Sequence, residues 1–164
     1  ASSDEYKRKV NTNYRKKDEK RSEVRPEVPA TQPRPTHDLL EERNQAPNLS
    51  DLGLEDFKTD PRSAFPFKGG ENEAWKRIEH YFWDTKKLQY YKKTRNGLLG
   101  TDYSSKFSAW LGNGSISAVS IYHEVRAFEK QVKKNQDTYW LIFELIWRDY
   151  FKYISLKHLS LLLI

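Results

Sequence analysis

Aromatic residues are distributed very unevenly along this chain, and the asymmetry decides where a core can form. Of the five Trp, ten Tyr and eight Phe residues, only Tyr6, Tyr14 and Phe57 precede Phe65. Burying large apolar side chains is the main favourable contribution to folding. The core must therefore be built from roughly the last hundred residues, which is close to the lower size at which a domain folds alone.

The N-terminal part is basic and rich in proline. Residues 1–25 carry nine Lys/Arg and five Asp/Glu, a local excess of +4 within a formal net charge of +6. Such a run is typical of a solvated arm, and a contact with nucleic acid is the sharper alternative. Four prolines follow between Pro26 and Pro35, which is typical of a connector. We predict that residues 1–62 form a mostly disordered or extended linker and that residues 63–164 form the folded domain.

Several classes of protein are disfavoured by what the sequence lacks. It contains no Cys, which excludes disulfides and Cys-ligated metals and fits an intracellular protein. No apolar run reaches the ~18–20 residues of a membrane span, and the first residues form no secretory signal. Common nucleotide-binding, hydrolase and zinc-protease motifs are missing, and no metal site is expected. The basic arm is compatible with import into the nucleus or an organelle, but no targeting pattern fixes the compartment.

The hydrophobic periodicity after residue 63 is helical, and we predict an all-α fold. Trp75, Ile78 and Phe82 form an apolar stripe on a helix that begins near Glu71. A short helix is expected to open at Ser104 or Ser105 and to stop at Gly112–Gly114. Three further expectations concern helix ends: Ser117 caps a long helix that continues to about Lys134, and Asp137 or Thr138 caps the last helix.

The last helix raises a question because it carries charges in the most apolar stretch of the chain, "FELIWRDYF" at 143–151. Being apolar nearly all round, this helix should be central, so its charges need partners. Glu144 and Arg148 are spaced i,i+4 and could form an intrahelical ion pair. Alternatively, they line a polar pocket in which Glu144 forms hydrogen bonds and Trp147 offers a stacking surface.

Two other segments contain residue types that suit ligand binding. "DYSSKFS" at 102–108 places hydroxyls and Lys106 at an expected helix start, where an anion would be favoured; a serine there is also an ordinary cap. "YYKKTRNG" at 90–97 interleaves basic and aromatic residues, as nucleic-acid surfaces do, or it is a solvated helix end. His80 and His123 are each isolated and are expected at the surface or the edge of the core.

The order of these segments resembles that of one known family. "DPRSAFPFKGGENEAW", "YKKTRNGLLGTDYSSKFSAWLGNGSISAVSIYHEVRAFE" and "NQDTYWLIFELIWRDYFKYISLKH" closely resemble the photolyase/cryptochrome family, in particular its cryptochrome-DASH branch. The resemblance covers about residues 60–158. It implies that the folded part is a partial helical domain that binds FAD in a folded, U-shaped form.

The resemblance also assigns candidate site residues. For FAD, Tyr91 matches a tyrosine that contacts the cofactor, the run Ser104, Ser105, Lys106, Phe107 and Ser108 matches a phosphate-binding segment, and Arg148 matches an arginine at the flavin. Lys106 stands where the wider family has Arg, which replaces a bidentate fork with a point charge. Glu144 matches an active-site acid near flavin and lesion. Trp147 matches a residue that packs on the flipped dimer, and Arg95 matches a basic DNA contact.

The activity implied is that of an FAD-dependent deoxyribodipyrimidine photolyase, a lyase that splits cyclobutane pyrimidine dimers under light. Its partner would be DNA, preferentially single-stranded, because extruding the lesion costs least there. The alternatives are a blue-light photoreceptor of the same family without repair and a non-catalytic fragment that binds nucleic acid.

Two departures from the family pattern bear on activity. The family's N-terminal α/β domain, which holds a folate antenna, has no counterpart in residues 1–25, so no folate is expected here. After "SLKH" the sequence reads "LSLLLI" and ends, before the family's second group of flavin-binding residues. We therefore expect the 164-residue chain to be C-terminally truncated relative to the family, to bind FAD weakly or not at all and to lack repair activity by itself.

Overall fold

The computed structural model describes residues 2–29 and 47–157, and within these ranges it contains helices and no strand. The helical segments are α1 (Ser2–Arg21), η2 (Ser50–Leu52), α2 (Glu71–Ile78), η3 (Glu79–Asp84), η4 (Lys87–Tyr90), α3 (Tyr91–Thr94), α4 (Ser108–Asn113), α5 (Ala118–Gln131) and α6 (Gln136–Lys157). The predicted all-α class is confirmed. The predicted division at residue 62 remains a prediction, and residues 30–46, in the middle of the predicted connector, lie outside the described residues, as do 158–164.

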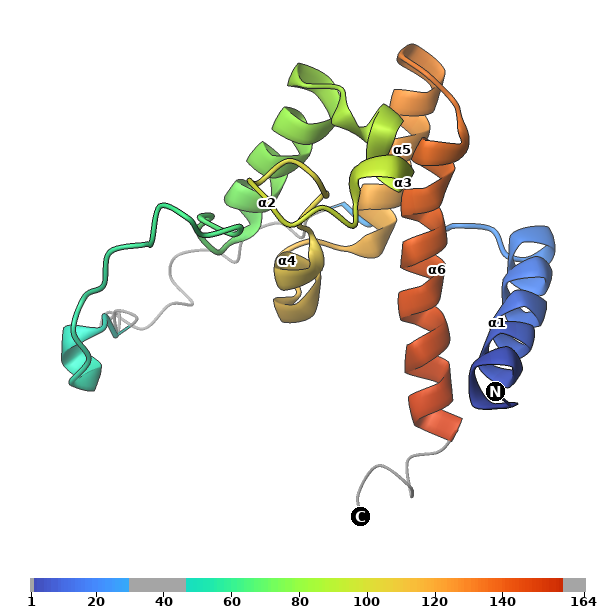
Figure 1. Cartoon of the computed structure of the whole chain (residues 1–164), viewed down its shortest axis with the longest axis horizontal. Helices are drawn as coiled ribbons and strands as arrows, with labels where there is room; N and C mark the ends of the chain where they lie inside the picture. The colour runs from blue at the N-terminus through green and yellow to red at the C-terminus, as the bar shows by residue number, and fades with distance from the viewer. Residues whose placement is uncertain (1, 30–46, 158–164) are drawn as a thin grey trace, which may run out of the picture.

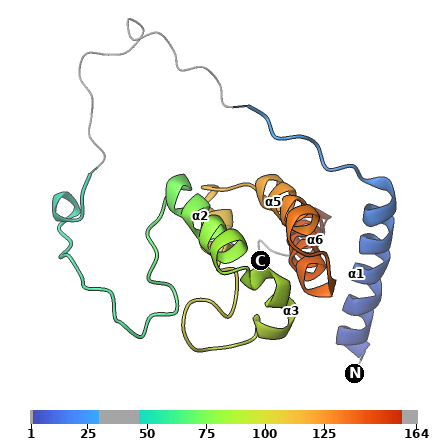
Figure 2. The ribbon, with the colours of Figure 1, turned by 90° about the horizontal axis from the view of Figure 1, so that it is seen from above.

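The core lies among α2, η3, η4, α4, α5 and the upper part of α6 (Figure 1). Its largest fully buried apolar side chains come from α2, η3, η4, α4 and α5: Ile78, Tyr81, Phe82, Leu88, Trp110, Ile121, Val125 and Phe128. Helix α6 contacts α1, α3, α5 and η4, so the prediction that this helix is central is confirmed. Seen from above, α2 and α5 lie on either side of the core, and α3 closes it beside α6 (Figure 2).

The apolar stripe predicted from Glu71 onward is confirmed, and its end is a wider helical turn. Ile78 and Phe82 are buried and Trp75 is half-buried. Beyond Ile78 the backbone continues as a π-helix, η3, which closes with the Thr85 amide donating to the His80 carbonyl at 3.0 Å. Such turns are rare and occur often at functional sites.

Helix ends agree with the sequence in part. Ser117 caps α5, because its hydroxyl accepts a hydrogen bond from the Ser120 amide at 2.9 Å. The expected caps of α6, Asp137 and Thr138, are wrong: Asn135 caps this helix and forms a reciprocal pair with Thr138 at 2.9 and 3.1 Å. An asparagine one turn earlier can accept from the first free amides equally well.

The short helix expected from Ser104 or Ser105 begins later. Helix α4 starts at Ser108 and ends at Asn113, before Gly114 in a left-handed conformation. The end agrees with the prediction, but residues 104–107 form an irregular loop. The hydroxyls of this segment are therefore presented by a loop, and the buried Arg77 binds the backbone carbonyls of this loop.

The N-terminal segment departs from the predicted disordered or extended state. Ser2–Arg21 form helix α1, which lies beside α6 in both views (Figures 1 and 2). Tyr14 packs on Tyr150 with ring centroids 5.5 Å apart, and the Arg15 guanidinium lies 5.1 Å above the Phe143 ring. Lys, Arg and Glu are good helix formers, and an aromatic face on α6 gives this helix a surface to bury. Residues 22–29 continue without regular structure, as expected for the connector.

Helices long and apolar enough to cross a bilayer were sought in the described residues, and none qualifies.

Candidate functional site

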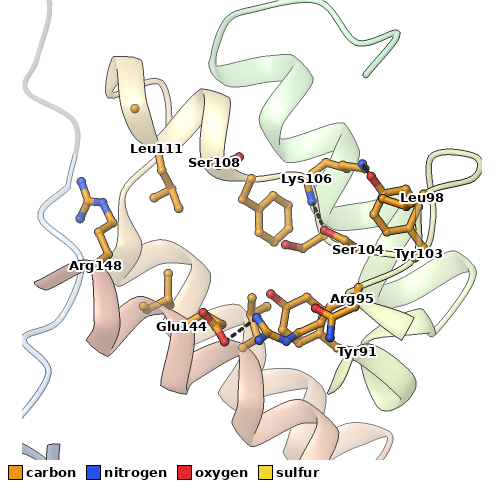
Figure 3. Close-up of a pocket in the computed structure, with 17 residues that line it drawn as sticks. Tyr91, Arg95, Leu98, Tyr103, Ser104, Lys106, Ser108, Leu111, Glu144 and Arg148 are labelled. Atoms are coloured by element: carbon orange, nitrogen blue, oxygen red, sulfur yellow. Dashed lines mark hydrogen bonds and ion pairs between the residues drawn. The ribbon is translucent and has the colours of Figure 1, made fainter. Parts of the chain in front are cut away.

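A pocket of about 650 Å³ lies between α3, the loop that follows it, the start of α4 and one face of α6 (Figure 3). Its volume is in the range of small-molecule and cofactor sites. The lining combines apolar and polar side chains from four segments: Tyr91, Arg95, Asn96, Gly97, Leu98, Tyr103, Ser104, Ser105, Lys106, Phe107, Ser108, Leu111, Gly112, Leu141, Glu144, Leu145 and Arg148.

The sequence-predicted site residues meet in this pocket, with one exception. Tyr91, the run Ser104 to Ser108, Glu144 and Arg148 all line it, and so does Arg95, which was predicted to contact DNA. Three segments that are distant in sequence thus converge on one cavity. Trp147 lies elsewhere on α6. The roles assigned to these residues remain predictions, whereas their convergence is a property of the fold.

Glu144 is paired across the pocket, not along its own helix. Its Oε1 atom lies 2.6 Å from Nη1 of Arg95, and the pair spans the cavity floor between α6 and the end of α3 (Figure 3). Arg148 instead lies 3.7 Å from the Asp149 carboxylate. The intrahelical Glu144–Arg148 pair is therefore wrong, and the polar-pocket interpretation of this face is the one that agrees with the contacts.

Burial raises the pKa values of Glu144 and Tyr91 on this cavity floor, and the charge of Arg95 opposes both shifts. Burial raises the pKa of Glu144, and the guanidinium of Arg95 opposes the increase without cancelling it. Burial also raises the pKa of Tyr91, and the nearby Glu144 carboxylate adds to the effect while Arg95 opposes it. A carboxyl group and a phenol with raised pKa values are weaker acids than usual, and both offer oxygen atoms for hydrogen bonds to a ligand.

The serine segment is held from behind by Arg77, a residue that the sequence interpretation did not single out. Arg77 donates to the carbonyls of Thr101, Ser104 and Ser105 at 3.0, 2.9 and 3.1 Å and to Oδ1 of Asp102 at 2.7 Å. The only sequence signal was its position: it follows Ala74 and precedes Ile78 and Tyr81 at helical spacing on a buried face. A cation buried at this position destabilises the folded state unless its charge and its donors are paired.

Asp102 binds three side chains, Arg77, His80 and Lys87, at the edge of this loop. Its other carboxylate oxygen, Oδ2, lies 3.0 Å from His80 Nε2 and 3.0 Å from Lys87 Nζ. Burial acts to raise the pKa of Asp102, but hydrogen bonds from Arg77, His80 and Lys87 together hold this pKa well below its usual range. His80 was expected at the surface or core edge, and its half-exposed ring is the partner of this carboxylate.

Lys106 occupies an unusual backbone conformation at the mouth of the serine loop. Its φ is 65°, which is uncommon for a residue with a side chain. Its amide donates to the Ser104 hydroxyl at 3.4 Å, and its ammonium contacts the hydroxyl and ring of Tyr103. Lys106 therefore lines the pocket while its charge is held against Tyr103 (Figure 3).

Trp147 belongs to an aromatic row on a neighbouring face of α6. Its ring stacks on Phe151 with centroids 5.4 Å apart and meets Phe143 edge-on at 6.1 Å. Trp140 extends the row, 4.5 Å from Phe143, and carries the Lys92 ammonium 4.3 Å above its ring. The polar pocket that was expected to include Glu144, Trp147 and Arg148 is thus confirmed in part: Glu144 and Arg148 line the pocket, and Trp147 lies beside it.

Clusters of three or more His, Asp or Glu side chains that could hold a metal ion were also sought, and the described residues contain none.

Comparison with known proteins places these features in a family context. Cryptochrome DASH of Gloeobacter violaceus is 48% identical over 147 residues, which cover 90% of this chain and 29% of the relative. Cryptochrome DASH of Xenopus laevis is 47% identical over 150 residues, with 91% and 28% covered. The crystal structure of a Synechocystis sp. cryptochrome superposes with a TM-score of 0.71 at 36% identity and covers 88% of this chain and 30% of that one. No family model matches. This chain spans less than a third of the length of these relatives.

Proposed function

Because this chain belongs to the cryptochrome DASH branch of the photolyase/cryptochrome family, we propose that its pocket is one wall of an FAD site in a light-driven DNA photolyase. The observation that supports the proposal most strongly is the convergence of Tyr91, the segment Ser104 to Ser108, Glu144 and Arg148 on a single cavity. The substrate and the activity are also proposed and not observed, because this chain covers less than a third of the length of its relatives.

The residues of the pocket fit such a cofactor in size, polarity and charge. The cavity of about 650 Å³ lies within the range of cofactor sites. Arg95, Lys106 and Arg148 supply three cations against the single carboxylate of Glu144, an excess that suits a pyrophosphate. Hydroxyls of Ser104 and Ser108 offer donors beside them, while Leu111, Leu141 and Leu145 provide apolar surface for a ring system.

We assign the chain's own residues distinct tasks in this site. The serine segment and Lys106 would bind phosphate oxygens, with Lys106 moving from Tyr103 to do so. Tyr91 and Arg148 would fix the orientation of the cofactor from opposite walls. Glu144, whose carboxylate is held by Arg95 at 2.6 Å, would accept hydrogen bonds at the boundary between cofactor and lesion. Bound reduced flavin would supply the chemistry, a light-driven one-electron transfer to the dimer and its return after the ring splits.

For the nucleic acid we propose single-stranded DNA that carries a cyclobutane pyrimidine dimer. Trp147 and Phe151 offer a stacked aromatic surface next to the pocket, and Phe151 is largely exposed. Base–aromatic stacking does not depend on sequence, and a damaged base in a single strand is the cheapest to extrude. Arg95 would then act on the lesion side of the pocket by holding the carboxylate of Glu144 in place.

The 164-residue chain alone would bind FAD weakly and would not repair DNA, because the described residues form an open wall on one side of the cofactor. The test is a repair assay under blue light with dimer-containing single-stranded DNA and added FAD, for this chain and for the long Gloeobacter violaceus relative. We expect repair by the relative and none by this chain. Light-dependent repair by this chain would contradict the expectation that it does not repair DNA by itself. A relative that binds FAD without repairing DNA would favour a photoreceptor, and salt-sensitive DNA binding without flavin would favour a nucleic-acid-binding fragment.

A further inference from the structure

The most completely satisfied buried charge outside the pocket belongs to Arg77. Its residue is only 3% exposed, and its guanidinium lies between the rings of Phe67 and Tyr81, 5.0 Å from each centroid. A buried cation is stable only when its donors and its charge are both compensated. The surroundings of Arg77 provide both.

All of the hydrogen-bond acceptors of Arg77 come from one short segment, residues 101–105. Three carbonyls, of Thr101, Ser104 and Ser105, accept hydrogen bonds from Nε and Nη2, and Asp102 accepts from Nη1. A guanidinium has five N–H donors in a rigid planar fork. Lysine, with a single nitrogen, could not reach these acceptors at once. The fork therefore dictates the backbone path of residues 101–105.

This segment is the one that carries the pocket hydroxyls. Ser104 and Ser105 line the cavity, while their carbonyls are bound to Arg77 on α2. The backbone is thus held from the side of α2, and the same residues contribute to the pocket wall. Without these contacts the segment has no regular structure to define it, because α4 begins only at Ser108.

We propose that Arg77 is a positioning residue: it fixes the serine loop so that Ser104, Ser105 and Lys106 are preset for an anionic ligand. Asp102 completes the device, since it also binds His80 and Lys87 and thereby ties the loop to η3 and η4. Arg77 does not line the pocket and acts only through the loop. The proposal rests on the proposed function for the identity of the ligand, FAD, but not for the behaviour of the loop.

The experiment compares the full chain with Arg77→Gln, Arg77→Lys and, as a matched control, Arg62→Gln. Arg62 also forms an arginine–carboxylate pair, with Asp60 at 2.7 Å, but both side chains are exposed and neither lines the pocket. Hydrogen exchange is measured for the amides of 101–106 and, as an internal reference, of α5. FAD binding is measured by fluorescence titration, and helix content by circular dichroism.

We expect loop amides to exchange about tenfold faster or more in both Arg77 variants, and FAD affinity to fall about tenfold, with α5 and helix content unchanged. The control should match the unmodified chain. Unchanged loop exchange in Arg77→Gln would overturn the proposal, as would faster exchange with undiminished FAD affinity. Recovery by Arg77→Lys would overturn the role of the fork.

Two further outcomes are distinguished. If the unmodified chain binds no FAD at all, the proposed function fails for this chain, and the exchange data still decide whether Arg77 fixes the loop. If the Arg77 variants do not fold, Asp102→Asn replaces them. This variant leaves Arg77 and its three carbonyl contacts intact, so we expect exchange at residues 101–106 to increase more than exchange in α5, and an equal or smaller increase at 101–106 would count against the proposal.

Discussion

Neutralising Glu144 distinguishes a stabilising ion pair from a carboxylate held in place for a ligand. Glu144→Gln preserves size and removes one charge from the pocket floor. The 2.6 Å contact with Arg95 would suggest that the variant is less stable. The raised pKa of Glu144 says the opposite, because a raised pKa means that the folded state disfavours the ionised form relative to the unfolded chain.

The magnitude follows from the exposure of the two side chains. Two unit charges about 4 Å apart attract by about 1–4 kcal/mol at effective dielectric constants of roughly 80 to 20. The side chains of Arg95 and Glu144 are 31% and 28% exposed, and pairs with this much solvent are usually worth about 0.2–1 kcal/mol. The cost of burying the carboxylate is larger than this gain. We therefore expect Glu144→Gln to be as stable as the unmodified chain at pH 7, or more stable by less than about 1 kcal/mol.

The assay is urea unfolding of both proteins between pH 4 and 8, with Glu79→Gln, at an exposed position, as the control. Near pH 4 Glu144 is largely protonated in both the folded and the unfolded chain, since its unfolded pKa is about 4.3. As pH rises through the window between the unfolded pKa and the raised folded pKa, the unmodified chain should lose stability relative to Glu144→Gln. At higher pH the difference in the free energy of unfolding between the two proteins should stay constant.

A loss of more than about 1 kcal/mol in Glu144→Gln at pH 7 would refute this reasoning, since it would exceed the usual value of such a pair. So would a gap that grows in favour of the unmodified chain as pH rises. Either result would mean that the Arg95 pair dominates and that Glu144 is chiefly structural.

Three other expectations test separate parts of the structure. Asp102→Asn should lower stability at pH 7 by about 1–2 kcal/mol, because charged hydrogen bonds are lost. In the unmodified chain the contribution of Asp102 to stability is present above its unfolded pKa of about 3.9, and it disappears as pH falls through the depressed folded pKa. A variant as stable as the parent at pH 7 would contradict this expectation. Burial and the acids Asp18 and Asp149 raise the pKa of Tyr14 to about 12, so α1 should loosen from α6 as pH rises from about 10 to 12, with hydrogen exchange in α1 as the readout. Tyr14→Phe should weaken this transition and leave the part due to Tyr139, whose hydroxyl donates to Glu19 on α1 and whose pKa burial also raises; an unchanged transition would contradict the role of Tyr14. Trp147→Ala should weaken binding of dimer-containing single-stranded DNA about fivefold or more in a fluorescence-anisotropy titration, and equal affinity would exclude the stacking role.

Much of the helical framework follows from local sequence alone. The stripe of Trp75, Ile78 and Phe82 and the cap at Ser117 require only periodicity and hydrogen-bond chemistry, and the structure agrees with both. The pocket residues were identified in a different way, by the order of motifs that resembles a family. Spacing within single helices could not have brought Tyr91, Ser104 and Glu144 together.

What the sequence did not reveal depends on tertiary contacts. The helical state of Ser2–Arg21 is supported by contacts of Tyr14 and Arg15 with α6, and composition alone suggests a solvated arm. Glu144 has a local candidate partner in Arg148, yet the fold supplies Arg95. Arg77 was not singled out from the sequence, because only the position of the 101–105 loop gives its charge a partner. In each case the deciding contact joins residues that are distant in sequence.

The decisive experiment for the flavin wall is a titration with FAD that is detected residue by residue. Backbone amides of the 164-residue chain would be followed by nuclear magnetic resonance as FAD is added, with Arg62→Gln as a variant outside the pocket. We expect weak, saturable binding with a dissociation constant of roughly micromolar to millimolar size. Shifts should concentrate at Tyr91, the segment Ser104 to Ser108, Glu144 and Arg148. A stoichiometric flavin that remains bound through purification would contradict the expected weakness, and saturable shifts that avoid this pocket, or none at all, would contradict its assignment as the flavin wall.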